Sequence, residues 1–185
     1  VGYSGGEPSI DPRFVEIVKR AKELGFTHQS LNTNGIRFKD AKFCRQVVEA
    51  GITSIDFSLH GHFAELHDEL VAKKGAFDAI VQACEHLRAL KAEGFQFHLS
   101  GTAVIARKNH VHLREIVEFM HGLGITNVRL KYAYEGNLNH DVIIQQVAPY
   151  QEVVPSVVAA LDHLAGKRGG FHVTHVPLCL LGGHA

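Results

Sequence analysis

The chain has 185 residues, 45% of them hydrophobic, which is enough for one domain with a substantial core. Its 19 lysines and arginines balance its 19 aspartates and glutamates, so no overall positive field recruits nucleic acid or an anionic membrane. No apolar run approaches the roughly 20 residues that span a bilayer, and the first residues lack a secretory pattern; we therefore expect a cytoplasmic protein without a nucleic-acid or membrane partner.

The sequence repeats one pattern four times: an amphipathic helical stretch ends in a glycine, and an apolar, strand-like run follows at once. The first helix is predicted to begin with Asp11 as N-cap and Pro12 as its first residue. A last helix is predicted from about Pro149 to Ala165, with Pro155 tolerated only in its opening turn. The glycines predicted to end the four helices in the left-handed conformation are Gly25, Gly51, Gly94 and Gly124.

Alternation of helices and strands at this spacing predicts a parallel sheet, either open or rolled into a barrel, in one domain spanning residues 1–185. The predicted strands lie near Val1–Tyr3, Thr27–Asn32, Ser54–Leu59, Phe95–Ile105, Asn127–Tyr132 and Phe171–Thr174.

Ligands of parallel α/β proteins bind where the strands end, so the residues after each strand are the candidate site. The first strand is followed by Gly5, Gly6 and Glu7, the second by Thr33 and Asn34. The exit of the third strand carries Ser58, and the exit of the fifth carries Lys131 and Tyr132. Each stretch alone is typical of a tight turn, but their recurrence at equivalent positions favours a binding site.

The segments "SGGEPSIDP", "LNTNG" and "ITSIDFSLHG", in this order and spacing, resemble the core of a radical S-adenosylmethionine (radical SAM) enzyme, and the resemblance extends to Tyr134. It implies a partial (β/α)6 TIM-like barrel that holds a 4Fe-4S cluster and S-adenosylmethionine. It also implies an oxidoreductase that abstracts a substrate hydrogen through a 5'-deoxyadenosyl radical. The implied partners are a small-molecule or peptide substrate, in peptide modification or cofactor maturation, and a reductant such as flavodoxin or ferredoxin.

The resemblance also implies roles for individual residues. Gly5 and Gly6 would bring the backbone close to the cofactor, and Glu7 would bind the methionine ammonium group. Ser58 would hydrogen-bond the methionine or ribose portion, and Thr33 and Asn34 would line the same wall. The adenine would rest on an apolar or aromatic ledge formed by Val104 and Ile105, or by Tyr132.

The sequence departs from the family pattern because it has no CxxxCxxC motif. Cys44 and Cys84 fall on apolar helix stripes and are expected in the core, and we expect Cys179 to be a core-facing thiol as well. We therefore predict a chain that is truncated before Val1 and possibly after Ala185, that holds no cluster ligands and that is inactive by itself.

Histidines cluster in two places but lack a ligand spacing such as HExxH, so structural or solvent-exposed histidines are favoured over a metal site. These are His60, His62, His67, His110 and His112.

Two other functions stay open. One is a non-catalytic barrel that binds S-adenosylmethionine or serves as a scaffold. The other is an unrelated barrel enzyme such as an aldolase or epimerase, for which Lys131 is the candidate Schiff-base lysine.

Overall fold

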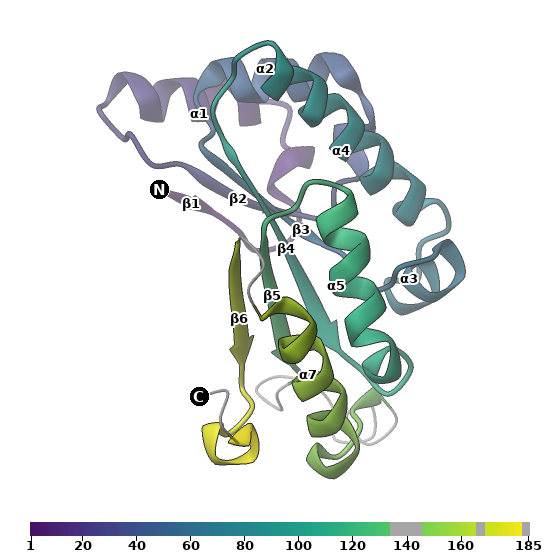
Figure 1. Ribbon diagram of the computed structural model, residues 1–185. Coiled ribbons are helices and arrows are strands. Elements are labelled where there is room, and N and C mark those ends of the chain that lie inside the picture. Colours follow the sequence, from purple (N-terminus) through teal and green to yellow (C-terminus); the bar gives the residue numbers. More distant parts are fainter. Residues whose placement is uncertain (134–145, 166–168, 183–185) are drawn as a thin grey trace.

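The structure is a computed structural model, and it describes residues 1–133, 146–165 and 169–182. Its six strands form one parallel sheet in sequential order, from β1 to β6 (Figure 1). The sheet does not close, since β1 and β6 pair with one neighbour each within the described chain, and the predicted partial barrel is thereby confirmed. The strands are β1 (Gly2–Tyr3), β2 (Ser30–Thr33), β3 (Ser54–Ser58), β4 (His98–Ile105), β5 (Asn127–Tyr132) and β6 (Gly170–Thr174).

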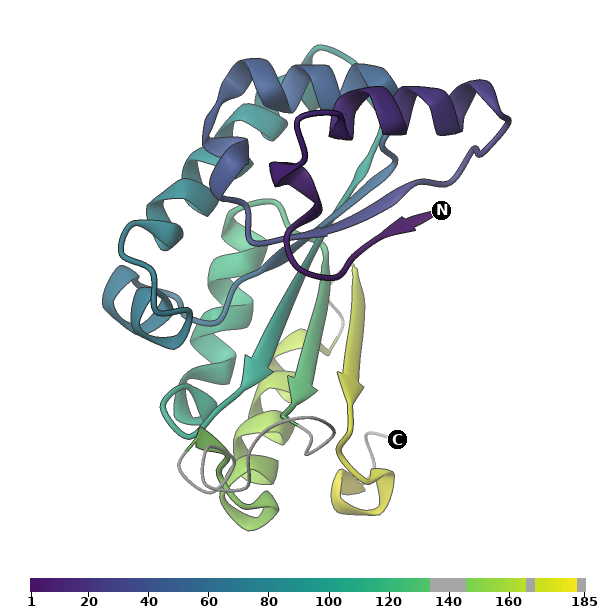
Figure 2. The ribbon, with the colours of Figure 1, turned by 180° about the vertical axis from the view of Figure 1, so that it is seen from behind.

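Helices cover one face of this sheet, and the opposite face carries none in the described residues (Figure 2). No helix in these parts of the chain is long and apolar enough to cross a membrane. The helices are α1 (Phe14–Glu23), α2 (Ala41–Ala50), α3 (Ala64–Leu70), α4 (Ala76–Ala92), α5 (Leu113–Gly122) and α7 (Tyr150–Leu164). Short 3-10 turns are η1 (Pro8–Ile10), η2 (Ile36–Lys39), η3 (His110–His112) and η4 (Leu178–Leu180).

The core lies between the helices and the covered face of the sheet. Alternate strand residues such as Leu31, Phe57 and Leu130 are fully buried there, because successive side chains of a strand point to opposite faces. Cys44 and Cys84 are buried in the same core, as their positions on the helix stripes predict. Cys179, by contrast, is exposed, so the expected core position is wrong for it.

Most element boundaries agree with the sequence prediction. The four glycines predicted to end helices have φ angles between +84° and +118°, as expected for left-handed backbone. β5 has the predicted bounds, whereas β2 and β4 begin three residues later than the apolar pattern indicates. A strand begins where its hydrogen bonds to the neighbouring strand begin. The register between two strands sets that position, and the sequence of one strand alone does not show it.

Two predictions about helices are wrong. α1 begins at Phe14 rather than Pro12, because Asp11 to Phe14 form a separate turn that the bond from Phe14 N to Asp11 O closes at 3.0 Å. Pro155 lies in the second turn of α7, not the opening turn. The helix continues past it because packing of its buried face, including Val157, offsets the one lost backbone hydrogen bond.

Candidate functional site

The Glu7 side chain links the end of β1 to the end of β2. Its Oε1 accepts hydrogen bonds from Ser9 N at 3.1 Å, Ser9 Oγ at 2.6 Å and Thr33 Oγ1 at 2.8 Å. Its Oε2 accepts one from Asn34 N at 2.6 Å. Since Oε1 is saturated and Oε2 has a single donor, the remaining acceptor capacity of the carboxylate is on Oε2.

Thr33 and Asn34 shape the turn that follows β2. Thr33 is buried, and its Oγ1 also accepts a hydrogen bond from Gly35 N at 3.1 Å. The exposed Asn34 accepts a hydrogen bond from Ile36 N through Oδ1, which is an Asx-type turn. Both residues therefore fix the Glu7 carboxylate at the carboxyl edge of the sheet.

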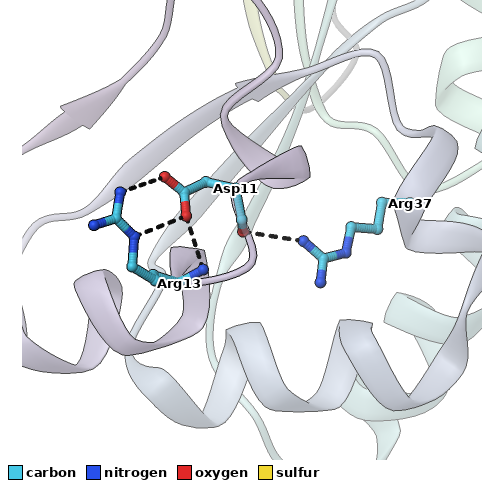
Figure 3. Close-up of polar contacts among 3 residues, drawn as sticks. All are labelled: Asp11, Arg13 and Arg37. Atoms are coloured by element: carbon cyan, nitrogen blue, oxygen red, sulfur yellow. Dashed lines mark hydrogen bonds and ion pairs between the residues drawn. The ribbon is translucent and has the colours of Figure 1, made fainter.

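The Arg37 guanidinium, which no sequence pattern indicates, binds the backbone of the same loop. Its Nη1 donates to Ser9 O and, at 3.2 Å, to Asp11 O, and Cζ lies 4.1 Å from the centre of the Phe43 ring. Figure 3 shows the bond to Asp11 O beside the ion pair of the Asp11 carboxylate with Arg13. No local signal marks Arg37, because its partners lie 26 to 28 residues earlier in the chain.

Substitution of Arg37 by glutamine is expected to lower the free energy of unfolding by about 1–3 kcal/mol, because two partly buried carbonyls lose a charged donor. The matched control is Arg20→Gln, which removes an exposed ion pair with Glu23 and is expected to change stability by less than about 0.5 kcal/mol. Urea unfolding of both variants measures the difference. An equal loss of stability in the two variants would show that Arg37 does not stabilise the loop.

Ser58 ends β3 next to this turn. Thr33 pairs with Phe57 across the two strands, so Asn34 and Ser58 are the next residues along adjacent strands. The Ser58 side chain alternates with the buried Phe57 and so lies on the face without helices. Its hydroxyl has no hydrogen-bond partner within the part of the chain that the structure describes. It is therefore available to form a hydrogen bond with a ligand.

Gly5 and Gly6 lie exposed beside Glu7, with φ angles of +86° and +56°. No heavy atom lies within 4 Å of an ideal Cβ at either position, so the surrounding space is open. The two glycines therefore expose backbone at the place where Glu7 is fixed, and their left-handed conformation explains the choice of residue.

The structure does not bring Tyr132 to this group. Its hydroxyl donates to Ala148 O at 2.7 Å and its ring stacks on Tyr150 with centroids 4.3 Å apart, among buried residues on the helix side of β5. Ile105 also lies on the helix side, whereas Val104 alternates with it onto the open face. Three residues were candidates for the ledge under the adenine. Of these, Val104 alone lies on the same face of the sheet as Ser58, because neighbouring side chains of a strand point to opposite faces.

His60 follows β3 and binds the neighbouring strand. Its Nδ1 accepts a hydrogen bond from Val104 N at 3.1 Å, and its amide donates to Nδ1 of His67 at 3.1 Å. Burial, together with the nearby His67, lowers the pKa of His60 to about 4. His60 is therefore a neutral imidazole with its proton on Nε2, and the chain holds it by structural bonds.

Metal-ligand geometry is absent from the described residues, where no three or more His, Cys, Asp or Glu side chains are arranged to hold an ion. Cys44 and Cys84 are buried in α2 and α4, and burial raises the pKa of each thiol to about 12. These two thiols do not fit the ligand set of an iron–sulfur cluster, which several deprotonated thiolates around one site must supply.

A hollow of about 560 Å³ lies at the opposite edge of the sheet, at the amino ends of β2, β3 and β4. Gln29 and Thr53 line it. The backbone amide of Gln29 donates to Thr53 Oγ1, and Thr53 Oγ1 donates to the backbone carbonyl of Gln29. The hollow therefore lies far along the strands from Glu7 and Ser58, on the side where loops lead into the strands.

Comparison with known proteins gives a consistent result. A family model described as the Radical SAM superfamily matches residues 1–120. A curated protein of Saccharolobus solfataricus, named as a probable GTP 3',8-cyclase, is 26% identical in an alignment that covers 81% of this chain and 59% of that protein. Among curated relatives of this name, the chain spans 40% to 59% of the length.

Solved structures share the fold at low sequence identity. SuiB of Streptococcus suis, bound to precursor peptide SuiA, matches with a TM-score of 0.74 and 15% identity, over 96% of this chain and 38% of that chain. The enzyme anSMEcpe with bound AdoMet matches with a TM-score of 0.65 and 16% identity, over 92% of this chain and 48% of that chain.

Proposed function

Because the chain belongs to the radical SAM superfamily, we propose that it binds S-adenosylmethionine at the carboxyl ends of β1, β2 and β3. The observation that carries the proposal is the fixed Glu7 carboxylate, which is bonded to Thr33 and to the Asn34 amide beside Ser58. A zwitterionic amino acid with a nucleoside needs this combination of a carboxylate, open backbone and a free hydroxyl.

In this arrangement the free acceptor capacity of Glu7 Oε2 binds the ammonium group of the methionine moiety. The exposed backbone at Gly5 and Gly6 lies close to the same group. The Ser58 hydroxyl bonds to the methionine or ribose portion, while Thr33 and Asn34 act by fixing Glu7. The chemistry that the cofactor supplies in this family is hydrogen abstraction by an adenosyl radical.

The proposal assigns no iron–sulfur ligand to this chain, because Cys44 and Cys84 are buried and Cys179 belongs to no group of three metal-ligating side chains in the described residues. It includes a cytoplasmic location and a reductant of the flavodoxin or ferredoxin type. A peptide or small-molecule substrate, in peptide modification or cofactor maturation, is supported by the names of the relatives, which include a peptide complex and a cyclase. An aldolase or epimerase is disfavoured, since Lys131 is exposed rather than enclosed in an apolar pocket as imine-forming lysines are.

The test is substitution of Glu7 by glutamine, which removes the charge and leaves the side-chain size unchanged. We expect the binding free energy of S-adenosylmethionine, measured by calorimetry, to weaken by about 1–3 kcal/mol, the range for a spoiled charged hydrogen bond. Glu16→Gln is the matched control, because Glu16 is an exposed carboxylate on α1.

A second variant separates cofactor binding from loop bracing. Ser9→Ala removes one hydroxyl bond to Glu7 Oε1 but leaves the carboxylate in place, so we expect a smaller effect on affinity than that of Glu7→Gln. Unchanged affinity in Glu7→Gln, or an equal loss in Ser9→Ala, would contradict the assignment of the ammonium group to Glu7.

A further inference from the structure

The face of the sheet without helices is mostly polar at its centre. A parallel sheet covered on both faces is normally apolar on both, so a polar face is suited to water or a ligand. Strand alternation settles which residues lie here, since an ideal Cβ on Gly101 would meet Met120 and Ile125 on the helix side. The central residues of the open face are Asp56, Ser58, Ser100, Thr102, Val104, Asn127, Arg129 and Lys131.

One charged cluster lies on this face. Thr102 Oγ1 donates to Asp56 Oδ1 at 2.8 Å, and Arg129 Nη1 donates to Asp56 Oδ2 and to Thr102 Oγ1, both at 3.3 Å. The Asp56 side chain is 13% exposed, whereas that of Arg129 is 43% exposed. Asp56 therefore anchors one nitrogen of a guanidinium whose other donors, on Nε and Nη2, have no partner in the described chain.

The register places this guanidinium level with the proposed cofactor site. Ser58 pairs with Thr102, Thr102 with Arg129, and Arg129 with His172. Adjacent strands lie about 4.8 Å apart, so Arg129 is roughly 10 Å across the open face from Ser58. This separation suits a second molecule held beside the cofactor.

The local charge favours an anion. Arg129 and the exposed Lys131 are two residues apart on one face of β5, and the one acidic side chain of the cluster is Asp56. An ideal Cβ at Gly170 would lie 3.7 Å from His172 Nε2, which places this imidazole on the same face. Arg129 thus offers a planar fork of donors for an anionic group, next to a second cation.

We infer that Arg129, with Lys131, is a binding site for a carboxylate or phosphate group of the substrate, and that Asp56 is a positioning residue that orients the guanidinium. The inference rests on the proposed function for the identity of the neighbouring cofactor. The cluster itself depends only on the contacts between β3, β4 and β5.

The experiment titrates the full-length protein with inorganic phosphate and, separately, with acetate, while backbone amide NMR signals are followed with and without S-adenosylmethionine. We expect one of the two anions to shift signals of β5, and Arg129→Gln to weaken that binding at least about tenfold. Arg114→Gln is the matched control, because Arg114 is an exposed arginine of α5 paired with Glu118. Preference for phosphate or for acetate distinguishes the two classes of anionic group.

Further variants keep the inference testable if Arg129→Gln does not fold. Lys131→Gln changes an exposed side chain and is expected to weaken the same anion about threefold, and Arg129→Lys is expected to restore part of the affinity. Absence of anion binding to β5, or equal binding in wild type and all Arg129 and Lys131 variants, would overturn the inference.

Two results separate this inference from the proposed function. Loss of S-adenosylmethionine affinity in Arg129→Gln, with competition between the anion and the cofactor, would assign the guanidinium to the cofactor carboxylate and overturn the substrate site. Unchanged cofactor affinity in Glu7→Gln together with anion binding at Arg129 would refute the cofactor assignment and leave the anion site intact.

Discussion

Replacement of Gly35 by alanine is expected to lower the free energy of unfolding by about 2–5 kcal/mol, the sum of backbone strain and overpacking. Gly35 has a φ of +76°, and an ideal Cβ there would lie 2.7 Å from Ile80 Cγ1 and 3.0 Å from Phe57 Cδ1. Both neighbours are fully buried and cannot move aside.

The matched control is Gly75→Ala. Gly75 has a similar φ of +81°, but no atom lies within 4 Å of its ideal Cβ. We therefore expect only the cost of backbone strain, a loss of about 1–2 kcal/mol in the free energy of unfolding. Denaturant unfolding compares the two variants. Equal destabilisation would show that the core around Ile80 and Phe57 can absorb a methyl group. Because Gly35 N also donates to Thr33 Oγ1, we expect Gly35→Ala to lower cofactor affinity as well.

Acidification is expected to destabilise the protein through His60. The pKa of its imidazole falls from 6.5 to about 4 on folding, chiefly because burial disfavours the charged form. Between these two values the unfolded chain binds a proton that the folded chain does not bind. The free energy of unfolding therefore falls as the pH drops through this window, by roughly 3 kcal/mol from His60, and the stabilisation is fully present above pH 6.5.

Urea unfolding at several pH values between 7.5 and 4 measures this loss of stability. His60→Asn keeps an acceptor for the Val104 amide but does not titrate, so we expect a shallower pH dependence than in wild type. The control is His98→Asn, an exposed position on β4, which is expected to retain the wild-type slope. Identical slopes for wild type and His60→Asn would refute the assignment.

The fold was predictable because its signals are local. Each signal lies within a short stretch of sequence: the apolar stripe of a helix, a terminal glycine such as Gly51, or the polar end of a strand. The predicted bounds of β5 agree with the structure at both ends. Pro155 was not predictable in the same way. Its helix is stabilised by burial against other elements, which overrides the local preference.

The candidate site was predictable in part. Glu7, Thr33 and Asn34 lie at the ends of strands that are adjacent in sequence and in space, so their proximity follows from the repeat itself. The position of Tyr132 on the covered face depends on strand parity at the very end of β5. The contact of Arg129 with Asp56 joins residues 73 apart and depends on the register of three strands.

The strict sequential order of the strands separates the proposed cofactor site from the proposed anion site along the chain. Every described contact that braces Glu7 comes from residues before the end of α4, whereas Arg129 and Lys131 belong to a unit encoded later. Changes in the later unit can therefore alter the chemical group that is selected without disturbing the glutamate turn. The residues of β5 can therefore vary, and with them the proposed anion site, while the turn that fixes Glu7 stays unchanged.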